Sequence, residues 1–369
     1  MNYYFDNNNK LYIGISPQTP ANSNLKWETT AQTNVGLDFA LFNGKLSGTV
    51  DYYYKKTHDL LFNVSVPDYL YGGTQLQNVG SLQNKGWEFM LNGVILDSKD
   101  WYISTSVNMS MNRNKVLNMG NEKEIFVSVT PQTGWSPYTG YSVLRVDEPL
   151  GQMRGLTYLG VWKSNEAEEA AKYGKQPGDS KYLDINGDHV IDGNDMDVIG
   201  NAMPKFTYAW NTSITFKDFD LNIIFNGVQG NKVWNFTRYL YSGMMSDCII
   251  PTNREVLDRW SPTNENSDYP NFSSSNVVEK QSSRWLENGS YLRLSNLTLG
   301  YTFNKLKRST FVKDAKIYVS GQNLFTITKY KGYNPEGSNT KSGQDIATGF
   351  DEAGYPAIRS YMVGVKFAF

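Results

Sequence analysis

Residues 101–112 have the sequence WYISTSVNMSMN, in which two kinds of side chain alternate. The odd positions, from Trp101 through Val107 to Met111, are mostly apolar, whereas the even positions, from Tyr102 to Asn112, are mostly serine and asparagine. Successive side chains of a β-strand point to opposite faces. The alternation therefore predicts a strand with one apolar face and one face of small polar groups.

The same alternation recurs along nearly the whole chain. Residues 206–216 and 219–225 predict a hairpin around Lys217 and Asp218. Residues 35–41 and 46–54 predict a second hairpin, in which Asn43-Gly44 supplies the positive φ angles of a tight turn. Further strands are predicted over residues 86–95, 291–303, 316–325 and 359–369. Most of these segments are about ten residues long, the length typical of a strand that crosses a membrane.

Strand length and the polar face favour a membrane barrel. Strands of soluble sandwiches are about five or six residues long, and their solvent faces are rich in Lys and Glu. Here the polar face carries Ser, Asn, Thr and Gly, which suits the lining of a lumen that holds water or a plug, with the apolar face turned to outer-membrane lipid. The predicted fold class is all-β, an antiparallel transmembrane β-barrel with long extracellular loops. A soluble barrel or sandwich is the alternative.

The connections between the predicted strands are unequal. Asn43-Gly44 and residues 97–100 are short turns, while residues 113–150 and 239–289 are long connections. Short turns on one side and long loops on the other are typical of transmembrane barrels. Two short helices are predicted inside the long connections, over residues 165–174, with an Asn cap and Glu168 three residues later, and over residues 252–260, where Thr252 is paired with Glu255.

Composition excludes several classes of protein. The 369 residues include 25 Tyr, 18 Phe and 9 Trp, and no apolar run approaches the roughly 20 residues that a membrane helix needs. The formal net charge is −1, which gives no global field to attract nucleic acid. The single cysteine, Cys248, has no second cysteine with which to form a disulfide. A helical membrane protein is excluded, and no nucleic-acid partner is expected.

One segment, residues 184–195 with the sequence DINGDHVIDGND, has the spacing of a metal-binding loop. Oxygen ligands fall at the loop positions 1, 3, 5, 7, 9 and 12 that an EF-hand uses for Ca²⁺. The predicted ligands are Asp184, Asn186, Asp188, the backbone carbonyl of Val190, Asp192 and Asp195. Two departures from the pattern are His189 at position 6, where glycine is usual, and Asp195 in place of a longer Glu. The alternative is an acidic turn without a metal.

No catalytic constellation is visible. His58 and Asp59 do not form a dyad, since neighbouring side chains diverge, and His189 lies inside the acidic loop. No catalytic and no cofactor-binding residues are predicted other than the calcium ligands. Tryptophans in the long connections suit the stacking of sugar rings or packing at a barrel rim. They are Trp135, Trp234 and Trp285.

Several stretches resemble the SusC/RagA family of TonB-dependent outer-membrane transporters. They include NVGSLQNKGWEF (78–89), YLRLSNLTLGYTF (291–303) and YVSGQNLFTITKYKGYNPE (318–336). The remaining stretches are NSNLKWETTAQTNVGLDF (22–39), residues 177–213 around the acidic loop, and the terminal strand. The matches lie in family order along nearly the whole chain.

The resemblance implies a barrel of about 22 strands, of which residues 1–369 form roughly the C-terminal half. It implies energised import of oligomers, either glycans or peptides, in the outer membrane, with a SusD-like surface lipoprotein as a lid and the TonB complex as motor. It also implies that the acidic loop is extracellular. Residues 1–10 read MNYYFDNNNK, which does not match the basic and apolar pattern of a signal peptide. The plug domain of the family also has no counterpart in the sequence. We therefore expect the chain to be part of a longer protein.

The last strand adds to this interpretation. Its apolar positions alternate from Tyr361 to Phe369, and an amphipathic strand that ends on Phe resembles the signal read by the outer-membrane assembly machinery. Half a barrel has two strand edges with unpaired backbone groups, so we expect it to misassemble unless another segment closes it. Two further hypotheses remain at this stage, a secreted calcium-stabilised carbohydrate-binding β protein and a barrel-borne hydrolase.

Overall fold

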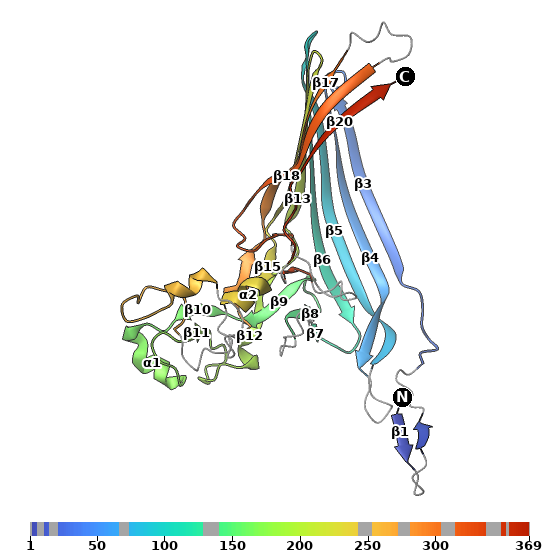
Figure 1. Ribbon diagram of the computed structural model, residues 1–369. Coiled ribbons are helices and arrows are strands. Elements are labelled where there is room, and N and C mark those ends of the chain that lie inside the picture. The colour runs from blue at the N-terminus through green and yellow to red at the C-terminus, as the bar shows by residue number, and fades with distance from the viewer. Residues whose placement is uncertain are drawn as a thin grey trace.

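The computed structural model describes most of the chain (Figure 1). The described residues are 2–5, 11–14, 21–65, 74–127, 140–242, 253–271, 281–303, 314–336, 348–351 and 354–368. The predictions for Cys248, Trp135, Thr252 and Phe369 concern residues outside these ranges.

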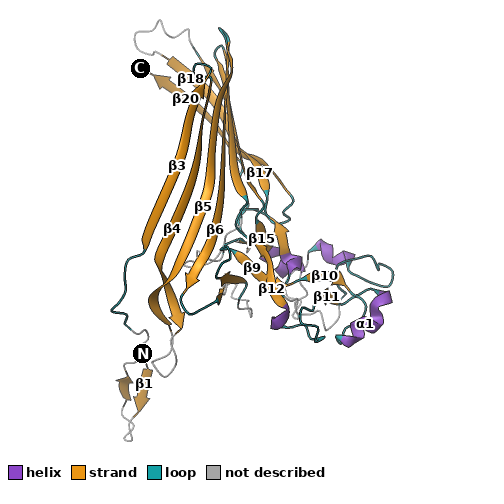
Figure 2. Cartoon of the chain, turned by 180° about the vertical axis from the view of Figure 1, so that it is seen from behind, coloured by secondary structure: helices purple, strands orange, loops and turns teal. Residues whose placement is uncertain are grey.

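A tall, curved sheet of nine antiparallel strands dominates the fold (Figures 1 and 2). Each strand pairs with the strands that precede and follow it in the sheet order β3-β4-β5-β6-β13-β14-β17-β18-β20. The strands are β3 (Thr29–Leu41), β4 (Leu46–Ser65), β5 (Thr74–Asp97), β6 (Trp101–Met119), β13 (Phe206–Phe216), β14 (Phe219–Gln229), β17 (Tyr291–Thr302), β18 (Asp314–Thr328) and β20 (Ser360–Ala368). The predicted strands are thus confirmed, and they form part of a barrel wall.

The two faces of this sheet differ as the alternation predicts. Val107 lies opposite Trp210, and both side chains are more than 40% exposed although they are apolar. On the other face Ser106 lies opposite Asn211. The apolar side chains therefore cover the outside of the wall, where lipid is the favourable environment, and the small polar side chains line the inside.

The predicted turns connect the strands at one end of the sheet. Asn43 and Gly44 have φ angles of 55° and 81°, as expected, but Phe42 also has a positive φ of 55°. The strand pairing ends at Leu41 and Leu46, so this turn is wider than the Asn-Gly dipeptide alone. At the same end, Lys217 adopts a φ of 50° in the turn between β13 and β14.

Three strands are much longer than the sequence pattern indicates. β4, β5 and β6 contain 20, 24 and 19 residues, and β5 begins at Thr74 instead of the predicted Gly86. The extension TQLQNVGSLQNK (74–85) has no apolar alternation, because both faces of a strand outside the lipid can contact water. Its ladder of backbone hydrogen bonds with β4 and β6 holds it in the sheet.

The long connections fold into a separate loop module at the opposite end of the sheet from the turns (Figure 1). It contains small sheets in the orders β12-β9-β8-β7, β10-β11 and β16-β15-β19. Their strands are β7 (Glu124–Val127), β8 (Ser142–Arg145), β9 (Gln152–Leu156), β10 (Tyr158–Val161), β11 (Ser180–Tyr182), β12 (Met196–Asn201), β15 (Lys232–Asn235), β16 (Leu286–Asn288) and β19 (Phe350–Asp351). A further hairpin, β1 (Asn2–Phe5) with β2 (Leu11–Gly14), lies near the N-terminus.

The loop module has its own hydrophobic core. Its members are Tyr141, Met153, Ala202, Trp234, Phe236, Trp285 and Phe350. Beside this core the Arg238 guanidinium pairs with the carboxylates of Glu255 and Glu287 at 2.9 and 3.2 Å. A packed core and partly buried ion pairs give the long connections a defined conformation.

Both predicted helices are present in shorter form. Residues 164–166 form a 3₁₀ turn that continues into α1 (Ala167–Lys172), and Glu166 caps it by accepting the Lys163 N–H, so the predicted Asn165–Glu168 cap is wrong. Residues 254–258 form a 3₁₀ helix in place of the predicted helix over 252–260, and the Glu255 carboxylate accepts a hydrogen bond from Arg238. Other short helices are α2 (Phe236–Ser242) and the 3₁₀ turns Gly193–Asp195 and Ser283–Trp285. Within the described ranges, no helix is long and apolar enough to span a membrane.

Candidate functional site

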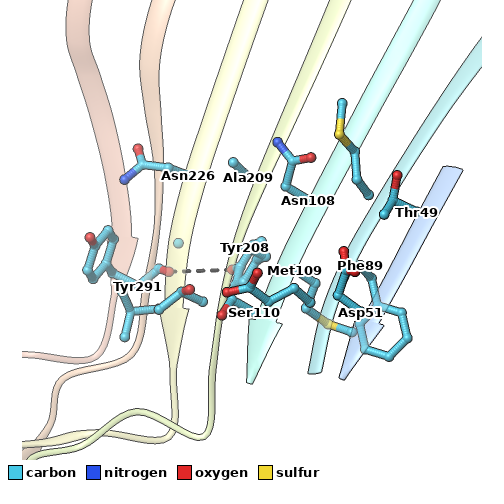
Figure 3. A pocket seen from close by; sticks show the side chains of 15 residues that line it. Thr49, Asp51, Phe89, Asn108, Met109, Ser110, Tyr208, Ala209, Asn226 and Tyr291 are labelled. Carbon is cyan, nitrogen blue, oxygen red and sulfur yellow. Dashed lines mark hydrogen bonds between the residues drawn. The ribbon is translucent and has the colours of Figure 1, made fainter. Parts of the chain in front are cut away.

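The inner face of the wall contains a hollow of about 520 Å³ (Figure 3). Side chains from six neighbouring strands line it in two rows that follow the strand register. One row contains Thr49, Met90, Asn108, Ala209 and Asn226, and the next contains Asp51, Glu88, Ser110, Thr207, Val228 and Tyr291. Hydroxyl, amide and carboxylate groups therefore face the lumen together.

Two carboxylates stand side by side in this wall. Asp51 of β4 lies directly opposite Glu88 of β5, and no described cation forms an ion pair with either. Gly36 of β3 makes room for Asp51, since a Cβ atom at this position would lie 2.2 Å from the Asp51 Oδ1 atom. Like charges that face each other across strands are unfavourable unless a cation or water stabilises them. This part of the wall therefore attracts positive or hydrogen-bond-donating groups in the lumen.

A loop segment is bonded to the wall at Tyr291, which lines the hollow. The Tyr291 hydroxyl and the Arg293 guanidinium of β17 donate hydrogen bonds to the Glu336 carboxylate, at 2.7 and 2.9 Å. Burial raises the pKa of Glu336, but the hydrogen bonds from Tyr291 and Arg293 outweigh it, and the pKa is lowered overall. The carboxylate is therefore ionised at neutral pH and holds the segment after β18 against the wall.

The acidic loop lies in the loop module, between β11 and β12. The Asp184 carboxylate accepts the backbone N–H groups of Gly187 and His189, at 2.7 and 3.0 Å. These bonds lower the pKa of Asp184, although desolvation acts in the opposite direction. His189 has a φ angle of 64°, the left-handed conformation that glycine adopts at this position of an EF-hand. The chain thus turns around Asp184 as the predicted ligand spacing requires.

The last predicted ligand joins the two ends of this loop. The buried Asp195 carboxylate accepts the N–H groups of Ile185 and Asp192, both at 2.9 Å. Asp188 and Asp192 accept the N–H groups of Val190 and Asn194 in the same way. All four aspartates are therefore turned toward backbone donors of the loop.

The structure places the six predicted ligands in one loop but does not show them as a coordination shell. Across the part of the chain that the structure describes, no group of three His, Cys, Asp or Glu side chains converges as a metal site. The donor set, carboxylates with an amide and a carbonyl, has the chemistry that Ca²⁺ prefers. The calcium site stays a prediction.

Other candidate residues have simpler roles. Trp234 and Trp285 are buried, with 1% and 0% exposure, so they pack in the core of the loop module and are not available to stack on sugar rings. His58 is exposed on β4, opposite Thr29. Asp51 and Glu88 are not among the residues predicted from the sequence, although both lie at polar positions of alternating strands.

Comparisons with known proteins identify the family. The family model described as "TonB dependent receptor-like, beta-barrel" matches residues 1–324. TonB-dependent receptor P3 of Formosa agariphila is 35% identical over 360 residues, which cover 95% of this chain and 35% of that receptor. TonB-dependent receptor SusC of Bacteroides thetaiotaomicron is 27% identical over 363 residues, with 97% of this chain and 34% of SusC covered.

The fold agrees with these matches. The solved structure of the RagAB peptide transporter superposes with a TM-score of 0.79 at 25% identity, covering 100% of this chain and 38% of that chain. The chain spans about a third of the length of the curated relatives that it matches. These matches do not favour a secreted carbohydrate-binding protein. With its lipid-facing and lumen-facing sides, the chain belongs to the TonB-dependent receptor β-barrel family, resembles SusC and RagA, and is an outer-membrane protein.

Proposed function

We propose that this chain forms part of the barrel wall of a TonB-dependent importer, which carries oligomeric solutes across the outer membrane. The observation that carries the proposal is the two-faced sheet, whose exposed apolar side faces lipid while its polar side faces a lumen with a hollow of about 520 Å³. Such a lumen accommodates a hydrated solute and a plug. The TonB complex supplies the energy through the plug, and the chain has no enzymatic activity of its own.

The substrate is a glycan or a peptide oligomer. The amide and hydroxyl groups of Asn108, Ser110, Thr207 and Asn226 bind both sugar hydroxyls and peptide groups. The Asn226 Oδ1 atom is buried and has no hydrogen-bond partner among the described residues. The RagAB relative, described as a peptide transporter, supports the peptide class, and a glycan is the second candidate because the same polar groups bind sugar hydroxyls.

A SusD-like lipoprotein is the proposed partner at the cell surface. The loop module offers it a preformed platform, because its core is packed and its ion pairs are partly buried. Exposed apolar side chains lie on and beside the acidic loop, namely Leu159, Leu183, Ile185 and Val190. Exposed apolar groups of this kind are typical of a protein contact surface.

Ca²⁺ is the proposed ligand of the acidic loop. Asp184, Asn186, Asp188, Val190, Asp192 and Asp195 would hold it, and the positive charge would offset the repulsion among four aspartates. The ion would fix the loop beside the apolar side chains Ile185 and Val190. Its role is therefore structural, at the surface that the partner contacts.

Uptake by host cells tests the transport proposal. Cells with and without the gene are given labelled oligosaccharides and labelled peptides, before and after collapse of the proton-motive force. We expect uptake of one class to require both the gene and the proton-motive force. Equal uptake in the two strains would contradict the proposal. Recovery of a lipoprotein with the tagged receptor from detergent-solubilised outer membranes tests the partner.

A further inference from the structure

On the outer face of β4, β5 and β6, successive rows of side chains change from aromatic and apolar to cationic. Tyr52, Trp87 and Met111 lie side by side in one row. The next row toward the loop module contains Tyr54, Lys85 and Arg113, and the one after it contains Lys56, Gln83 and Lys115. An aromatic row is thus followed at once by two rows with four cations. We call Lys56, Lys85, Arg113 and Lys115 the cationic patch.

The cationic patch lacks sufficient anions of its own. Lys85 and Arg113 are exposed and directly opposite each other, which is unfavourable for like charges. Lys115 pairs with Asp147 at 2.8 Å, but no described carboxylate forms an ion pair with the other three cations. Arg113 donates only through Nη1, to the carbonyls of Asn112 and Lys205. Its remaining N–H groups are available to an anion.

The position of the cationic patch identifies the anion. From Trp101 to Met111 the outer face is apolar except for Thr105, and β6 rises about 34 Å along its axis over this length. At a strand tilt of about 45° this gives an apolar band of about 25 Å, the height typical of outer-membrane barrels. Lys85 and Arg113 therefore lie at the boundary of the band that is nearer the loop module. Because they are on the side of the long loops, this boundary is the extracellular one.

We propose that the cationic patch binds the phosphate of an anionic lipid of the outer leaflet. The guanidinium of Arg113 and the ammonium of Lys85 form charge-assisted hydrogen bonds to the phosphate oxygens. Tyr54, in the same row as Lys85 and Arg113, and Trp87, in the adjacent row of the apolar band, are 37% and 46% exposed and contact the apolar part of the same molecule. A lipid is preferred to free phosphate because the patch continues the lipid-facing surface without a break.

Bound lipid can be counted directly. The receptor is purified from host outer membranes in mild detergent, and native mass spectrometry measures the phosphorylated lipid that remains bound per receptor. We expect the Lys85→Ser/Arg113→Ser double variant to bind this lipid roughly 25-fold more weakly, at about fivefold per cation. Lys99→Ser, at the turn end of β5 and β6, is the matched control and should retain the lipid. Excess inorganic phosphate should not displace it.

Three results would overturn the proposal. They are equal lipid retention in the double variant and the wild type, equal loss in the Lys99→Ser control, and displacement by inorganic phosphate, which would indicate an anion site without lipid selectivity. Heat-modifiable migration on gels verifies that each variant is folded. If the double variant does not fold, the charge-conserving Lys85→Arg/Arg113→Lys variant must keep the lipid and each single Ser variant must lose part of it.

Discussion

The hydroxyl group of Tyr330 donates a 2.6 Å hydrogen bond to the carboxylate of Asp351, and both side chains are buried. Asp351 is in β19, where it pairs with Asn235 next to Trp234 of the module core. The bond therefore attaches the segment that follows β18 to the centre of the loop module.

Removal of this hydroxyl should destabilise the loop module. We expect Tyr330→Phe to lower its free energy of unfolding by about 1–3 kcal/mol, because the buried Asp351 carboxylate loses a hydrogen-bond donor. Denaturant titration of the purified receptor measures this through the fluorescence of the buried tryptophans. Tyr333→Phe is the control, since Tyr333 is 66% exposed. Equal stability of Tyr330→Phe and the wild type would refute the expected role.

Stability at high pH should depend on the same residue. Burial, together with the hydrogen bond to Asp351, raises the pKa of Tyr330 well above 10. The folded state keeps a proton that the unfolded state releases above about pH 10, so this contribution is complete below pH 10 and declines as pH rises further. Unfolding curves recorded between neutral and strongly alkaline pH should show a decline that Tyr330→Phe reduces. An unchanged decline in the variant would mean that other titratable groups cause the loss of stability at alkaline pH.

Charge should be tolerated on one face of the wall only. Val107→Arg places a cation in the lipid band and should destabilise the inserted protein by about 2–4 kcal/mol. Ser106→Arg, one position away, points into the lumen and should be much less harmful. The amount of each variant in the outer-membrane fraction and its refolding into lipid vesicles provide the comparison. The reverse order would mean that the two faces are exchanged.

Calcium should protect the acidic loop from proteolysis. We expect Ca²⁺ to slow cleavage within residues 184–195, chelators to reverse this, and the Asp184→Asn/Asp188→Asn variant to lose the effect, because Ca²⁺ affinity depends on the number of charged ligands. Glu168→Gln, on exposed α1, is the control. Mass spectrometry of the fragments measures the cleavage. Calcium-independent cleavage of the wild type would favour an acidic turn without a metal.

The part of the fold that sequence predicts best is the part that contacts lipid. Residues 101–112 and 206–216 alternate because one face of each strand is in lipid and the other is in water. Residues 74–85 contact water on both sides, so nothing in their order of polar side chains marks them as strand. Only pairing with β4 and β6 shows that they continue β5.

The residues of the candidate site also differ in whether the local sequence predicts their positions. The spacing of Asp184, Asp188 and Asp195 is local, and the structure places them in one loop. The opposition of Asp51 and Glu88 depends on the register between two strands, which a single sequence does not specify. The burial of Trp234 and Trp285 depends on contacts among distant segments, so no local pattern distinguishes them from exposed residues.

The order of strands in the large sheet also affects how such a wall is assembled and how it changes over evolution. From β3 to β20 every strand is paired with its predecessor in the sheet. Even after the long connection that follows β6, the next strand of the sheet, β13, pairs with β6. Adding one hairpin at a time therefore never requires an earlier pair to open, which keeps each closing step local. For the same reason, the connection between β6 and β13 can be lengthened, shortened or exchanged during evolution without altering the register of these two strands.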